Sequence, residues 1–304
     1  MERDFAFLCV YGQLVCTYAT AMNILLIGPG RIGSTFAFHL ALAGHAVDVL
    51  ARGQRMADLR RDPAVVSLDG RRAPVTVIDA IDVSIAYDLV IVTILAHHVD
   101  ALIAPLAASR ASTIVFMFNT FESTGKWRDA LGADRLVHGF PNMSAYFEAG
   151  KLRSVIDGPG MVTTLSSAKW AAVLQQAGMP AEVEHDMDSF LRTHAAFVVP
   201  LMIAGQWTWK RDRALSWAEA RTLVAAMLEA LALVRSLGHT VKPAMVAFCA
   251  RLPSALLTGA VWLLGRTAAV KNLGEFGPGE VRALIDAMVA AGPGQTAKLL
   301  AIRP

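Results

Sequence analysis

Three glycines in the stretch GPGRIG have the spacing of a loop that binds phosphate groups. Gly28, Gly30 and Gly33 follow the G-x-G-x-x-G pattern, and residues 24–27 ahead of them are wholly apolar, as in a strand buried on both faces. Residues 31–43 carry apolar side chains at helical spacing, and residues 46–50 form a second apolar run. Together they have the length of a Rossmann βαβ unit. We therefore predict a dinucleotide-binding loop rather than a bare structural turn.

Each glycine has its own role in such a loop. Gly28 makes the turn, Gly30 lets the backbone approach a pyrophosphate, and Gly33 lets the helix pack on the strand. The free N–H groups and the dipole of the helix N-terminus attract the negative charge. The candidate cofactor-binding residues of the loop are Gly28, Pro29, Gly30, Arg31, Ile32 and Gly33.

The end of the second strand indicates which dinucleotide would bind. NAD sites usually place an acid here for the ribose 2′-hydroxyl, whereas NADP sites tolerate an arginine for the 2′-phosphate. The strand is followed by Arg52, while Asp48 lies within it and is expected to hydrogen-bond to a neighbour. We predict NADPH/NADP+ as the cofactor, with Arg52 binding the 2′-phosphate.

Length and composition limit the function classes. The chain has 304 residues, enough for two domains, and its net charge of +3 comes without a basic run that would indicate nucleic-acid binding. The three cysteines have no metal or redox spacing, so we expect no metal site and a reduced, cytoplasmic setting.

Residues 1–21 form an unusual leader. Residues 5–21 carry no charge, but the residues before them are net acidic, unlike the basic start of a signal peptide. A membrane span would need about 20 apolar residues and would run directly into the first strand. We interpret the leader as non-native or disordered, with Met22 as the natural start. The alternative is an amphipathic or membrane-associated extension.

The rest of the first half alternates strands and helices. Apolar runs at 75–78, 89–94, 113–118 and 136–140 predict strands, with helices at 99–108 and 167–177 and short strands between 142 and 164. This pattern predicts a Rossmann domain over residues 22–185 with a mostly parallel sheet. Ligands bind at the carboxyl ends of such strands, where Thr93, His97, His98 and Asn119 lie.

The second half reads as helical throughout. Residues 187–210, 214–237, 243–264 and 279–291 predict long helices, with Pro200 and Pro253 as positions where a helix should kink or break. We predict an all-α domain over residues 186–304, which binds substrate and could also hold a homodimer interface. The apolar stretch at 194–209 is interpreted as a buried core helix rather than a membrane span.

These motifs resemble the ketopantoate reductases (2-dehydropantoate 2-reductases) over most of residues 22–291. GPGRIG, the Gly44-His45 pair and Arg52 match the family's opening, DLVIVTILAHH is similar to its D-L-x-x-V-T-x-K-A segment, and MFNTFES to its H-N-G-M-G segment. The resemblance implies a substrate cleft between a Rossmann and a helical domain. It also implies that Asn119 lies near nicotinamide and substrate, and that Glu280 faces the active site.

The chain departs from the family at its lysines. Leu95 stands where one lysine should be, and the matching helix, DSFLRTHAAFVVPLM, has none. Reducing a carbonyl requires a proton or a charge-stabilising donor. His194 is the proposed proton donor because histidine titrates in the useful range; its alternative is a core histidine. Arg192 can only stabilise charge. Glu280 would orient a donor, form an ion pair with Arg192, or simply begin a helix.

The sequence thus favours an NADPH-dependent reductase of a small carbonyl (2-oxo acid-like) or imine substrate with an altered catalytic set. The alternative is an NADP(H)-binding protein without dehydrogenase activity, either a sensor or a redox-neutral enzyme.

Overall fold

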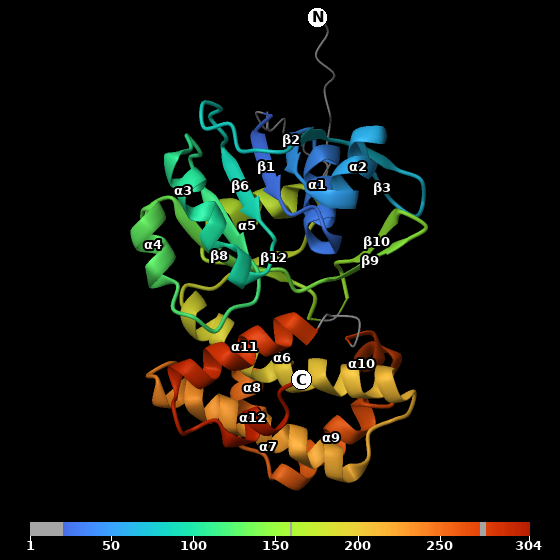
Figure 1. Ribbon diagram of the computed structural model, residues 1–304, viewed down its shortest axis with the longest axis vertical. Helices are drawn as coiled ribbons and strands as arrows, with labels where there is room; N and C mark the ends of the chain where they lie inside the picture. The colour runs from blue at the N-terminus through green and yellow to red at the C-terminus, as the bar shows by residue number, and fades with distance from the viewer. Residues whose placement is uncertain (1–20, 159, 274–277) are drawn as a thin grey trace, which may run out of the picture.

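Two layers of different composition make up the molecule. The computed structural model describes residues 21–158, 160–273 and 278–304, so the interpretation of the leader concerns residues outside the described part except for residue 21. Figure 1 shows an α/β half above and a helical half below, with α6 and α11 at the boundary between them. The strands end before residue 184, and every described element after it is a helix.

An eight-stranded sheet forms the centre of the first half. Its order is β12-β11-β8-β7-β6-β1-β2-β5, and all neighbours pair in parallel except β11 with β8. The strands are β1 Asn23–Ile27, β2 Ala46–Leu50, β5 Thr76–Ile78, β6 Leu89–Val92, β7 Ile114–Met117, β8 Leu136–Phe140, β11 Thr163–Leu165 and β12 Ala181–Val183. The α/β fold class predicted from the alternation of elements is confirmed.

Helices cover both faces of this sheet and bury it. One buried cluster joins α1 and α5 to the sheet through Phe36, Leu40 and Trp170, and another joins α3 and α4 through Leu106 and Trp127. The helices are α1 Arg31–Leu42, α2 Gly53–Arg61, η1 Ala96–His98, α3 Asp100–Ala108, α4 Gly125–Leu131 and α5 Ala168–Gln176. Two hairpins, β3 Ala64–Val66 with β4 Arg72–Pro74 and β9 Ser144–Glu148 with β10 Lys151–Val155, pack beside α1.

The strand order reverses between β1 and β6. From β1 the chain continues outward to β2 and β5, and from β6 it continues to β7 and β8 on the other side. In open α/β sheets this reversal opens a crevice at the carboxyl ends of the two central strands. Gly28 follows β1 and Thr93 follows β6, so both residues lie at this crevice.

The second half is built around one long helix. Helix α6 packs against α7, α10 and α11, and its Ala195, Val199 and Ile203 are fully buried among them. The helices are α6 Met187–Arg211, α7 Trp217–Ser236, α8 Ala244–Cys249, α9 Ser254–Leu264, α10 Ala268–Leu273, α11 Pro278–Ala291 and α12 Ala297–Ala301.

The two helical prolines behave differently. Pro200 lies inside α6, which runs on unbroken to Arg211, whereas Pro253 is the N-cap of α9 and separates it from α8. The single helix predicted over residues 243–264 is therefore wrong. A proline lacks the N–H of a helical bond and clashes with the preceding turn, so it fits best at a helix start.

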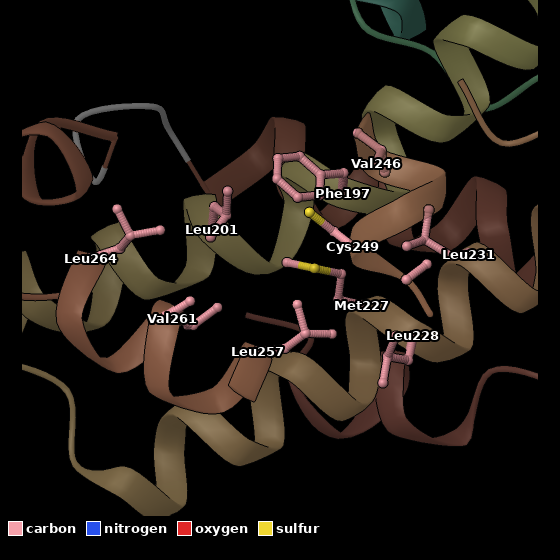
Figure 2. A pocket seen from close by; sticks show the side chains of 12 residues that line it. Phe197, Leu201, Met227, Leu228, Leu231, Val246, Cys249, Leu257, Val261 and Leu264 are labelled. Carbon is pink, nitrogen blue, oxygen red and sulfur yellow. The ribbon is translucent and has the colours of Figure 1, made fainter. Parts of the chain in front are cut away.

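An apolar cavity of about 150 Å³ lies inside the helical half. Figure 2 shows Phe197 and Leu201 of α6, Met227 of α7 and Leu257 of α9 around this space, with Cys249 beside them. It contains no polar lining atom and lies apart from the glycine-rich loop. No helix in the described ranges combines the length and apolarity needed to cross a membrane.

Candidate functional site

The glycine-rich loop has one open position between two crowded ones. Gly28 adopts φ +88°, and a Cβ there would lie 2.6 Å from Cγ2 of Ile94. A Cβ at Gly33 would lie 2.2 Å from the Gly28 carbonyl oxygen, so α1 can approach β1 only without a side chain. At Gly30 the nearest atom to such a Cβ is 4.0 Å away. The space over Gly30 is where a ligand can approach the backbone.

Side chains from three elements fix this loop. The Thr93 hydroxyl donates to the carbonyl oxygens of Ile27 and Gly28 at 3.1 and 2.7 Å. Arg55 Nε donates to the Pro29 carbonyl at 3.0 Å, and its Nη2 donates to the Ser34 hydroxyl at 3.0 Å. The loop is therefore held in place before any ligand arrives.

Arg55 is a residue whose role the sequence did not reveal. Its guanidinium lies 4.6 Å from the centre of the Phe147 ring, on the β9–β10 hairpin, and burial lowers its pKa. Phe147 and Pro29 are far from Arg55 in the chain, so no local motif could have indicated these contacts.

Arg52 stands at the position predicted for a 2′-phosphate ligand. It is the N-cap of α2 and is exposed, and its side chain contacts no acid among the described residues. Asp48, by contrast, accepts a hydrogen bond of 2.7 Å from the Tyr87 hydroxyl, as expected for a strand residue bound to a neighbour. Burial and this carboxylate raise the pKa of Tyr87.

A cavity of about 330 Å³ separates the Rossmann half from α6, α10 and α11. Gly30 and Gly33 border it on one side, and Asn119, His194 and Glu280 border it on the others. Its remaining walls are mostly apolar. They include Ile32, Ile94, Leu95, Met117, Phe118, Phe140, Met143, Val198, Met202 and Leu273.

Asn119 and Glu280 meet across the two halves. The Asn119 Nδ2 donates to Glu280 Oε1 at 2.9 Å, although the residues are 161 positions apart. The Asn119 Oδ1 is buried and has no partner among the described residues. The alternative ion pair of Glu280 with Arg192 does not form.

Arg192 binds backbone outside the cavity. Its Nη1 donates to the Phe121 carbonyl at 2.6 Å, its guanidinium lies 5.2 Å from the Phe121 ring, and burial lowers its pKa. One turn earlier, Asp188 accepts a 2.8 Å hydrogen bond from the Thr124 hydroxyl. Helix α6 therefore holds the loop that carries Asn119. Arg192 does not line the cavity, so it is not placed to stabilise charge on a substrate there.

His194 lines the cavity with a neutral ring. Its ring centre lies 3.8 Å from that of Phe140 and 6.4 Å from that of Phe190. Burial lowers its pKa from 6.5 to about 4. The expectation that His194 titrates in the physiological range is wrong, because apolar surroundings disfavour the imidazolium. At neutral pH it can offer an N–H but not a positive charge.

The other candidate groups lie at the edge of the site. His97 and His98 are exposed on η1, with ring centres 4.1 Å apart, and His97 borders a small recess of about 40 Å³ beside Asn119 and Glu280. Leu95 borders the main cavity, and no lysine is found among the described residues that line it.

This arrangement defines a class of proteins in which a Rossmann half and a helical half enclose a cleft beside a glycine-rich loop. Residues 24–164 match the family model described as ketopantoate reductase PanE/ApbA. The 2-dehydropantoate 2-reductase of Vibrio cholerae serotype O1 is 30% identical over 139 residues, which are 45% of this chain and 43% of that protein. The match thus spans less than half the length of that curated relative.

Solved structures share the fold over almost the whole chain. The PanE/ApbA family ketopantoate reductase from Ralstonia eutropha JMP134 has a TM-score of 0.69 at 16% identity and covers 93% of this chain and 97% of its own. The 2-dehydropantoate 2-reductase from Methylococcus capsulatus has a TM-score of 0.66 at 17% identity, covering 93% and 94%. A D-mandelate dehydrogenase in complex with NADH reaches 0.68 at 11%, covering 93% and 97%. The resemblance of this chain to the ketopantoate reductase family is confirmed.

Proposed function

We propose that the protein is an NADPH-dependent reductase of a small carbonyl or imine compound. The observation that carries this proposal is the open backbone at Gly30, which faces the same cavity as Asn119, His194 and Glu280. A dinucleotide whose pyrophosphate lies over Gly30 could extend its nicotinamide toward these side chains. The NADH complex of the D-mandelate dehydrogenase gives the same fold a nicotinamide cofactor in that protein.

The residues of the loop fit this cofactor. The Gly30 surface and the N-terminus of α1 would hold the pyrophosphate, because unpaired N–H groups and the helix dipole favour anions there. Arg52, exposed and without an acidic partner among the described residues, would bind the 2′-phosphate. Pro29, Arg31, Ile32 and Thr93 would complete the contacts. When bound, NADPH supplies a hydride from its nicotinamide ring.

The chain's own residues then orient and polarise the substrate. Glu280 fixes the amide of Asn119 through the 2.9 Å hydrogen bond. His194 would donate a neutral N–H toward a carbonyl oxygen, a role that a neutral imidazole can fill. Arg192 would act by holding the Asn119 loop rather than by touching substrate.

The experiment is energy transfer from tryptophan to nicotinamide in the purified protein, first with NADPH and then with NADH. We expect saturable transfer with tighter binding of NADPH, followed by NADPH oxidation with one class in a panel of 2-oxo acids, ketones and imines. No binding by this method or by calorimetry would contradict the proposal.

A second candidate is an NADP(H)-binding protein without dehydrogenase activity. The observation in its favour is the combination of an intact glycine loop with a cavity whose described lining has no lysine and whose histidine is neutral. Tight NADPH binding without oxidation across the whole panel would favour this candidate.

We further propose a homodimer and a cytoplasmic location. Large apolar side chains are exposed on α8 and α9, among them Phe248 and Leu256 at 62% each. One structural neighbour is titled a dimeric ketopantoate reductase, from Staphylococcus aureus. Light scattering should give twice the chain mass, which Phe248→Glu should reduce to one chain mass. Fractionation of native cells tests the location.

A further inference from the structure

We propose that the substrate reduced in this cavity is an iminium ion, a protonated C=N group, whose N–H lies against Asn119 Oδ1 and the Glu280 carboxylate. This inference rests on the proposed reductase function and names its substrate class. Three independent features of the cavity carry it: the hydrogen-bond acceptors, the distribution of charge, and the absence of a proton donor suited to a carbonyl.

The first feature is a pair of acceptors that face each other. A carboxylate only accepts hydrogen bonds, so Asn119 must turn its NH₂ group toward Glu280 and leave its Oδ1 free. This Oδ1 is buried without a partner among the described residues. A buried unpaired acceptor is costly, and a ligand with a donor relieves that cost. A carbonyl oxygen brings no donor, whereas an iminium N–H does.

The second feature is charge. A 2-oxo acid requires a cation for its carboxylate, yet Arg31 is the one arginine or lysine among the described residues that line the cavity. Arg31 begins α1 beside the glycine loop, on the side proposed for the pyrophosphate. On the helical side the charged lining residue is Glu280, while Arg192 is bound to the Phe121 carbonyl elsewhere. A cationic substrate suits this side of the cavity.

The third feature is proton supply. Hydride transfer to a carbonyl leaves an alkoxide that must gain a proton. In the iminium reaction the C–H bond at nicotinamide C4 breaks, a C–H bond forms at the iminium carbon, and the C=N π pair becomes the nitrogen lone pair. The products are an amine and the oxidised nicotinamide, and no proton enters the step. A site without lysine, whose histidine is neutral, is sufficient for this chemistry.

The walls indicate the substituents. Phe140, Val198 and Met202 present apolar surface around the polar pair, and the flat ring of His194 stacks on Phe140. Since the cavity of about 330 Å³ must also hold the nicotinamide, the substrate is small. A five- or six-membered cyclic imine with apolar substituents fits these conditions.

The test compares matched substrates with NADPH as reductant. The probes are 2-methyl-1-pyrroline and 3,4-dihydroisoquinoline, the ketones cyclopentanone and 1-tetralone of similar shape, and phenylpyruvate as a 2-oxo acid. We expect kcat/KM for the imines to exceed that for the ketones and the oxo acid at least about a hundredfold. Faster reduction of phenylpyruvate or a ketone would overturn the inference and leave the reductase function standing. NADPH binding without any reduction would overturn both.

A variant separates charge from shape. Glu280→Gln keeps an oxygen acceptor for Asn119 but removes the negative charge, so we expect kcat/KM for the imines to fall at least about tenfold. NADPH affinity and thermal stability should stay unchanged. Glu122→Gln is the matched control, because Glu122 pairs with Lys126 and does not line the main cavity.

A binding readout completes the test. The protonated product amine 1,2,3,4-tetrahydroisoquinoline, titrated by calorimetry into the NADP+-loaded protein, should bind at least about tenfold more weakly to Glu280→Gln than to the natural protein. Equal binding to both would overturn the role of the carboxylate in holding a cation.

Discussion

At the scale of single residues, His194 illustrates how burial changes the chemistry of a side chain. Its ring lies between Phe140 and Phe190, and its pKa falls to about 4. Desolvation penalises the charged imidazole, and no acid offsets that penalty. His194 is therefore an N–H donor and a stacking surface at neutral pH, not an imidazolium acid.

His194→Phe separates these two properties. The variant keeps an aromatic ring against Phe140 and removes the N–H. We expect reduction of any carbonyl substrate to slow at least about a hundredfold, the scale of losing a proton-transferring group. Reduction of an iminium should change by less than about tenfold. Turnover measured on both substrates checks this, and an unchanged carbonyl rate would remove His194 from the mechanism.

Arg52 should decide between the two dinucleotides. Hydrogen bonds to a charged group contribute about 1.5–3 kcal/mol, so Arg52→Ala should weaken NADPH binding roughly ten- to a hundredfold. NADH lacks the 2′-phosphate and should bind as before. Energy-transfer titrations of both nucleotides measure the effect, with Arg60→Ala as a control because Arg60 pairs with Asp79 on the surface. Equal losses for both nucleotides would mean that Arg52 contacts something other than the 2′-phosphate.

His138 predicts how stability depends on pH. Burial lowers its pKa from 6.5 to about 4, partly offset by Asp188, and its Nε2 has no partner among the described residues. The unfolded chain thus binds a proton near pH 6.5 that the folded chain refuses until about pH 4. The stabilisation is complete above pH 6.5 and is lost as the pH falls.

Between pH 7 and pH 5, His138 should therefore remove about 1–2 kcal/mol from the free energy of unfolding. Urea unfolding at both pH values measures this loss. His138→Leu, close in volume and without a titrating group, should lose less by that amount. The same loss in both proteins would assign the acid sensitivity to other groups.

At the scale of elements, the glycine loop depends on contacts between β1, α1 and β6. Gly33 is crowded by the Gly28 carbonyl, the Thr93 hydroxyl and Leu26, whereas Gly30 is open. The same substitution should therefore have opposite effects at two positions only three residues apart.

Gly33→Ala should destabilise the fold, because the new methyl group would force α1 away from β1. Gly30→Ala should leave the melting temperature nearly unchanged, because its φ of −72° suits alanine. Its methyl group would nevertheless occupy the space proposed for the pyrophosphate, so NADPH should bind at least about tenfold more weakly. Thermal melts and nucleotide titrations of the pair test this. Normal NADPH affinity in Gly30→Ala would mean that the loop is only a turn.

At the scale of the whole molecule, the loop after β7 joins the two halves. Asn119 reaches Glu280 on α11, and the Phe121 carbonyl and the Thr124 hydroxyl reach Arg192 and Asp188 on α6. These contacts set the position of the polar pair in the cavity relative to the glycine loop.

The Thr124–Asp188 contact can be measured by a double-mutant cycle. Thr124→Val, Asp188→Ala and their combination should give a coupling of about 1–2 kcal/mol in urea unfolding, as a hydrogen bond to a charged acceptor does. Substrate turnover should fall in both single variants, since the Asn119 loop loses an anchor, while NADPH affinity should hold. Additive effects on stability would show that the two halves are joined by other contacts.

Much of this architecture was readable in the sequence. Residues 46–50 and 136–140 were predicted as strands with the bounds that the structure has for β2 and β8, and the parallel sheet followed from the alternation of elements. Short elements such as α2, α10 and α12 were not predicted. Their few residues lack a clear period, and their helices form because neighbouring elements cover them.

The sequence by itself determined the glycine loop, the fold class and the missing lysines, because each depends on residue type and local spacing. Only the tertiary structure decided that Asn119 binds Glu280, that Arg192 binds the Phe121 carbonyl and that His194 is neutral. Those outcomes depend on which distant side chains meet and on how much water they exclude. Local spacing along the chain encodes neither quantity.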